Sequence, residues 1–109
     1  MMKKQNMDRT RLLVMGLLGG GDMYGYQMIV ELERRSDGTF SMKEGTLYPV
    51  LHGMEKDGLV DAYEQAAPTG RMRKYYRLTR KGKEALKTET QEWRQYSAAV
   101  DAVLGVSFA

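Results

Sequence analysis

The sequence predicts a mainly α-helical domain that carries one small β-hairpin. Two features indicate this class: apolar residues mark four helical segments, and two short alternating segments flank a loop of turn residues. The chain has 109 residues. A chain of this length forms one modest hydrophobic core. We expect residues 1–78 to form the main domain and residues 79–109 to form a C-terminal helix that mediates dimerisation.

The first two helices are predicted from an apolar segment and a periodic segment. Residues 10–18 (TRLLVMGLL) are almost wholly apolar and predict a buried helix. The glycine-rich sequence GGGDMYG then predicts a turn, with Asp22 as the N-cap of the second helix. That helix ends near residues 36–38 and is marked by Tyr26, Ile29 and Val30, and Leu32 widens its apolar stripe.

The rest of the chain is arranged around residues 41–60 (SMKEGTLYPVLHGMEKDGLV). One apolar stripe at helical spacing predicts a third helix that ends at Gly58 and contains Leu47, Val50, Leu51 and Met54.

Two N-caps are possible for the third helix. Ser41 forms a capping-box pattern with Glu44, whereas Thr46 as N-cap would place Pro49 in the first turn. We favour a start between residues 43 and 45, with a distortion at Pro49.

The opposite face of this third helix carries hydroxyls, an imidazole and little bulk. It contains Thr46, Tyr48, Pro49, His52 and Gly53, with Lys43 and Lys56 at its ends. One interpretation is an ordinary packing helix. The other is a face that closely approaches another surface.

Two alternating segments follow, at residues 59–64 and 73–78, and the sequence QAAPTG between them contains turn residues. They predict a β-hairpin. The second and third helices, joined by a short glycine-containing connection, form a helix-turn-helix pattern. A hairpin after such a pattern is a wing, so the expected architecture is a winged helix-turn-helix.

Positive charge is concentrated in and after the hairpin. Residues 70–87 carry a net charge of +7, while the remainder carries −4. Such a local excess favours a polyanion as partner. The wing cations expected to contact phosphate are Arg71, Arg73 and Lys74; the later ones (Arg80, Lys81, Lys83 and Lys87) fit a solvated helix face equally well.

A last helix is predicted from about Arg80 to Leu104, with Thr79 as its N-cap. At about 1.5 Å per residue it would be close to 37 Å long, more than the core of the first 78 residues spans. We expect a second copy of the chain to cover part of it; the alternative is that the helix folds back on its own domain. The expected dimer-interface residues are Leu86, Trp93, Tyr96, Val100 and Leu104.

Trp93 admits two interpretations. It is either a large interface anchor or, with Tyr96, one wall of a pocket for a flat aromatic effector.

The composition argues against catalysis. The chain has no cysteine and one histidine, and it contains no catalytic or metal-binding motif, so we predict no enzyme activity, no metal and no cofactor. No apolar run approaches the roughly 20 residues that span a bilayer. The basic start, with Lys3 and Lys4, precedes only a short apolar run, so we expect no secretion signal, no membrane partner and a cytoplasmic location.

Three strings carry a family resemblance: MYGYQM, EGTLYPVLHGMEKDGLV and GRMRKYYRLTRKGKEAL. They resemble the PadR family of winged helix-turn-helix transcriptional regulators over residues 12–86, and the single C-terminal helix resembles the smaller of its two size classes. The resemblance implies a homodimer, a DNA-binding winged domain and a C-terminal helix that swaps or pairs between protomers. It also implies DNA contacts by Lys43, Thr46, Tyr48, His52, Arg71, Arg73, Lys74 and Tyr75.

The main functional hypothesis is therefore a dimeric, sequence-specific DNA-binding regulator. It acts as a repressor on a palindromic operator in double-stranded DNA, and the resemblance implies release by a small, aromatic effector at the dimer interface. One alternative is an aromatic-ligand sensor or multidrug-binding protein for which DNA binding is secondary. Another is a winged helix that binds proteins and never DNA.

Overall fold

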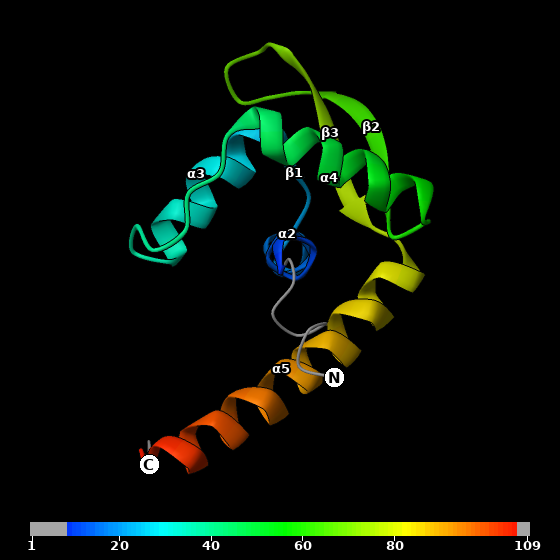
Figure 1. Ribbon diagram of the computed structural model, residues 1–109. Coiled ribbons are helices and arrows are strands. Elements are labelled where there is room, and N and C mark those ends of the chain that lie inside the picture. The colour runs from blue at the N-terminus through cyan, green and yellow to red at the C-terminus, as the bar shows by residue number, and fades with distance from the viewer. Residues whose placement is uncertain (1–8, 107–109) are drawn as a thin grey trace.

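The computed structural model describes residues 9–106, which form four helices and a three-stranded antiparallel sheet (Figure 1). In chain order the elements are α2 (Thr10–Gly19), β1 (Met23–Tyr24), α3 (Gly25–Arg35), α4 (Glu44–Lys56), β2 (Val60–Ala66), β3 (Met72–Leu78) and α5 (Arg80–Leu104). The predicted mainly α-helical fold with a hairpin is confirmed. The short strand β1 was not predicted. Lys3 and Lys4 lie outside the described residues.

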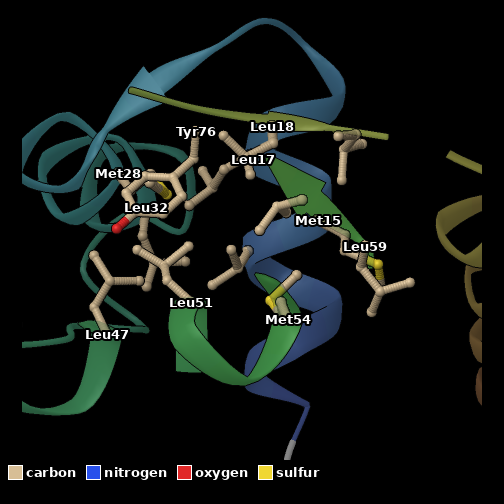
Figure 2. Close-up of a cluster of buried hydrophobic side chains, with 13 residues drawn as sticks. Met15, Leu17, Leu18, Met28, Leu32, Leu47, Leu51, Met54, Leu59 and Tyr76 are labelled. Carbon is tan, nitrogen blue, oxygen red and sulfur yellow. The ribbon is translucent and has the colours of Figure 1, made fainter. Parts of the chain in front are cut away.

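One hydrophobic core joins α2, α3, α4 and the hairpin (Figure 2). The helix α2 is central to it, since it contacts α3, α4, β3 and α5. This explains why its sequence is almost wholly apolar. The core consists of Val14, Met15, Leu17, Leu18, Met28, Leu32, Leu47, Leu51, Met54, Leu59, Val60, Tyr76 and Leu78.

The second helix differs from its prediction at both its start and its buried face. Tyr24, not Asp22, is the N-cap of α3, and the Tyr24 amide donates a hydrogen bond to the Gln27 side chain at 3.0 Å. Asp22 instead accepts a hydrogen bond from the Tyr63 hydroxyl at 2.6 Å, because β1 brings it beside the hairpin.

The buried face of α3 consists of Gly25, Met28 and Leu32. Tyr26 and Val30, which we expected on the apolar stripe, are 60% and 46% exposed. Their hydrophobicity misled the prediction, since the helix is rotated so that the residues two positions later face α2.

The third helix begins where we favoured, with Lys43 as the N-cap of α4. Neither Ser41 nor Thr46 caps it. Pro49 lies inside the helix and has no amide hydrogen to donate to the carbonyl of Gly45.

The sheet has the order β1-β3-β2, and the wing is the hairpin of β2 and β3 with the loop of residues 67–71 between them. The register pairs Val60 with Leu78 and Ala66 with Met72, so the strands are longer than predicted. The loop is closed by a hydrogen bond from the Ala67 amide to the Arg71 carbonyl at 2.7 Å, and Gly70 adopts a positive φ of 92°. β1 pairs with the opposite edge of β3.

The C-terminal helix has the predicted bounds and the predicted cap. The Thr79 hydroxyl accepts a hydrogen bond from the Gly82 amide at 3.0 Å. Figure 1 shows α5 running away from the rest of the fold, which makes the molecule 51 Å long but only 28 by 25 Å across. Its later half therefore has little of its own chain to pack against.

Candidate nucleic-acid interface

The outward face of α4 is the first part of the candidate site. Three buried residues (Leu47, Leu51 and Met54) fix the rotation of the helix, so residues about half a turn away point to solvent. These exposed residues are Thr46, Pro49, His52, Gly53 and Lys56, and Lys43 is exposed at the N-cap. Glu44 and Glu55 stand on the flanks. Within α4, which is described throughout, the outward face carries no carboxylate.

Tyr48 does not belong to this face. It is half-buried and packs against the start of α3, with its hydroxyl over Gly25. A β-carbon on Gly25 would lie only 2.8 Å from the Cζ atom of Tyr48. Tyr48 follows Leu47 by about 100° around the helix, which turns it toward α3 and not toward solvent.

The wing adds cations on the same side of the molecule as α4. The Lys74 ammonium lies 5.6 Å from the centre of the Tyr76 ring, which faces the core. Burial raises the pKa of the Tyr76 hydroxyl; the charge of Lys74 opposes this rise and that of Glu55 on α4 adds to it. Lys74 therefore lies on the core-facing side of the hairpin. Arg71 is exposed where the loop meets β3.

The opposite face of the hairpin carries a row of three tyrosines. The Tyr75 ring lies 5.3 Å from Tyr24, edge to face, and 5.8 Å from Tyr63, stacked. The guanidinium of Arg73 lies 5.5 Å from the centre of the Tyr24 ring, and that of Arg77 lies 5.1 Å from the centre of the Tyr63 ring.

The tyrosine row changes the expected role of two wing residues. Tyr75 is only 7% exposed, and the Nε atom of Arg73 is buried without a hydrogen-bond partner. Both were expected on the contact surface, but alternation along β3 turns them away from α4. They pack on the face of the hairpin that is turned away from α4. The row combines three strands, so no local pattern in the sequence predicts it.

A second candidate region lies at α5. Leu86, expected at the dimer interface, packs against the core of its own chain, whereas Trp93 is 43% exposed. The guanidinium of Arg9 lies 4.8 Å from the Trp93 ring and 5.2 Å from the Tyr96 ring, a pairing that the sequence does not predict. Trp93 also lines an apolar groove of about 760 Å³ between α2, the end of α3 and α5.

The remaining residues that we expected at a dimer interface lie along the later half of α5. Tyr96 and Val100 are partly exposed, and Leu104 is 68% exposed. Among residues 9–106 no three histidine, cysteine or acidic side chains gather as metal ligands. Over the same residues, no helix combines the length and the hydropathy required to cross a bilayer.

Comparison with known proteins agrees with this architecture. A transcriptional regulator of Mycobacterium tuberculosis is 34% identical over 96 residues, which are 88% of this chain and 83% of that protein. The crystal structure of a PadR-like transcriptional regulator from Bacillus cereus superimposes with a TM-score of 0.81 at 28% identity and covers 91% of this chain and 94% of that one.

The fold is also shared with PadR of Bacillus subtilis, solved in complex with operator DNA. That structure has a TM-score of 0.68 at 24% identity and covers 76% of this chain and 47% of the other. The family model described as the transcriptional regulator PadR-like family matches residues 14–88. With most of the chain matched in sequence and in fold, this protein belongs to the PadR-like family of transcriptional regulators.

Proposed function

We propose that this chain is a homodimeric, sequence-specific DNA-binding protein that represses transcription from palindromic operators. The observation that carries the proposal is the exposed, carboxylate-free face of α4, which offers hydroxyl, imidazole and ammonium groups. Lys74 lies on the core-facing side of the hairpin, against which α4 packs, so we infer that helix and hairpin offer cations to one polyanion. PadR of Bacillus subtilis, which has the same fold and was solved in complex with operator DNA, supports DNA as that polyanion.

The residues divide between reading bases and holding phosphates. Lys43, Thr46 and His52 contact base edges or phosphates from the major groove. Arg71 and Lys74 hold backbone phosphates beside it. Arg73, Tyr75 and Tyr48, which the resemblance also assigns to DNA contact, act instead by packing.

Dimerisation through α5 is supported by its uncovered apolar end. Val103 is 87% exposed and Leu104 is 68% exposed, while the groove along α2 is apolar and open. If α5 of a second copy lies in this groove, both the apolar end of that helix and the lining of the groove are removed from water. The dimer then presents its two α4 helices to successive major grooves, about 34 Å apart.

In-vitro selection from a pool of random duplexes tests the central proposal. A dimer that reads two half-sites enriches a palindrome whose centre-to-centre spacing is about one helical turn. A pool that enriches no palindrome would overturn sequence-specific binding.

The wing offers a matched pair of charge-neutralising variants. Lys74→Gln should weaken binding to all duplexes and reduce the slope of log affinity against log salt by about 0.9, the value of one phosphate contact. Arg77→Gln removes the same charge from the opposite face of the hairpin, over Tyr63, and should leave the slope unchanged. Equal slopes for both variants would show that the hairpin acts only through its net charge.

Release by a flat aromatic effector is supported by Trp93 and Tyr96 beside the groove. The same groove favours the second candidate function, a ligand sensor whose DNA binding is secondary. Titration of the tryptophan fluorescence with a panel of planar aromatics tests both, because Trp93 is the only tryptophan in the chain. A ligand that quenches Trp93 and dissociates the operator complex supports the repressor. Quenching without dissociation supports the sensor, and no quenching removes the pocket.

A further inference from the structure

The C-terminal end of α4 is tied to two other helices at a single residue, Asp57. The Asp57 carboxylate forms an ion pair with Arg11 of α2, at 3.1 Å between Nη2 and Oδ2. The Asp57 backbone carbonyl accepts a hydrogen bond from the Lys81 ammonium of α5 at 2.9 Å. The end of α4 is thereby connected to two of the three helices that line the apolar groove, α2 and α5.

The next residues reinforce the junction between α4 and α5. The Thr79 hydroxyl donates a hydrogen bond to the Gly58 carbonyl at 2.6 Å, and the Thr79 amide donates one to the Leu59 carbonyl at 3.0 Å. Gly82 lies directly against Leu59, with no space for a β-carbon. The two helices therefore meet at a closely packed corner, not through a loose linker.

Lys81 joins the end of α4 to α5 through a charged donor. The last carbonyls of a helix lack donors within the helix, and a cation there also complements the helix dipole. The Arg11–Asp57 pair is about half-exposed on both sides and Lys81 is exposed as well, so solvent weakens both contacts. The Lys81 contact is charge-assisted and spans the two helices directly.

We propose that Lys81 is a positioning residue that sets the angle between α4 and α5, and with it the operator spacing that the dimer accepts. This inference rests on the proposed function, in which α5 joins the protomers and α4 reads each half-site. The angle between them then determines both the separation and the relative rotation of the two α4 helices. Lys81 acts through the Asp57 carbonyl and not through DNA.

The experiment compares Lys81→Met with the matched variant Lys83→Met and the conservative variant Lys81→Arg. Lys83 is exposed on the same helix, and its side chain has no hydrogen bond or ion pair among residues 9–106. Affinity is measured on the selected operator and on versions with one base pair added or removed between the half-sites. Each such change rotates one half-site by roughly a tenth of a turn.

The full-length wild-type chain should prefer the selected spacing, and Lys81→Met should reduce that preference about fivefold, the order expected for a charge-assisted hydrogen bond at the surface. Lys83→Met should lower affinity for all three duplexes by one common factor, and Lys81→Arg should restore the preference. Hydrogen exchange of the amides in residues 55–59 should accelerate in Lys81→Met alone, without DNA.

Two results are decisive against the inference. The first is an equal spacing preference in Lys81→Met and Lys83→Met, together with unchanged hydrogen exchange at residues 55–59. It would show that Lys81 affects DNA binding only through its positive charge. A wild-type chain that binds every duplex alike would overturn the proposed function, and the spacing role of Lys81 with it.

Discussion

At the scale of single residues, the contact between Gly25 and Tyr48 determines how closely α3 and α4 approach. Gly25→Ala places a methyl group against the Tyr48 ring, and we expect it to lower the free energy of unfolding by about 1–3 kcal/mol. Gly53→Ala is the matched control, because nothing lies within 4 Å of that position and the helix gains about 0.5–1 kcal/mol. Urea denaturation measures both, and equal effects would refute tight packing at Gly25.

Glu31 is the residue whose ionisation most clearly depends on folding. Hydrogen bonds from Arg34 and Arg35 lower the pKa of its carboxyl from 4.5 to about 2. A lowered pKa stabilises the fold above pH 4.5, and this contribution disappears as the pH falls toward 2.

We therefore expect the wild-type melting temperature to fall more steeply than that of Glu31→Gln between pH 4.5 and 2. Solvent weakens the ion pairs, so the difference is modest. Melting curves at several pH values measure it. Parallel curves for the two proteins would show that Glu31 has the same pKa when the chain unfolds.

Single residues also show where prediction from sequence stops. The apolar stripe correctly placed Leu47, Leu51 and Met54 inside, because a helical period fixes which face is buried. It did not place Tyr48 or Tyr75, since tyrosine is compatible with both solvent and core. Their positions depend on neighbours from distant parts of the chain, Gly25 and Tyr24.

At the scale of elements, the N-cap residue of α5, Thr79, stabilises two segments with one side chain. The Thr79 hydroxyl caps α5 and also bonds the turn after α4. We expect Thr79→Ala to cost about 0.5–2 kcal/mol in the free energy of unfolding. Thr79→Ser keeps the hydroxyl and should retain most of that stability. Chemical denaturation measures the free energy of unfolding of both variants. An equally large loss in the serine variant would show that the methyl group of Thr79 matters more than its hydroxyl.

The bounds of α4 and α5 were predictable because their signals are local. Thr79 as a cap and Gly58 as a stop are each encoded within a few residues. β1 could not be predicted, because a two-residue strand exists only through its pairing with Tyr75 and Tyr76, about fifty positions later. That pairing also moved the start of α3 and redirected Asp22 toward Tyr63.

At the scale of the whole molecule, the proposed dimer depends on the apolar end of α5. We expect Val103→Glu combined with Leu104→Glu to give a folded monomer in sedimentation, since both side chains are exposed in the single chain. Operator affinity should fall by about a hundredfold or more, because each half-site is then bound alone. Gln95→Glu adds a charge at an exposed position of the same helix and serves as the control. A double variant that remains dimeric would place the interface elsewhere.

The long unsupported half of α5 has a further consequence for how such a regulator responds to its own abundance. If protomers must first pair along this helix, then at low copy number operator occupancy grows with the square of the protein concentration. A small rise in protein concentration near the dissociation constant of the dimer then changes expression disproportionately. Monomers at lower concentrations leave the gene unrepressed. The C-terminal helix would thus make repression depend on protein concentration, besides setting the distance between the two DNA-binding domains.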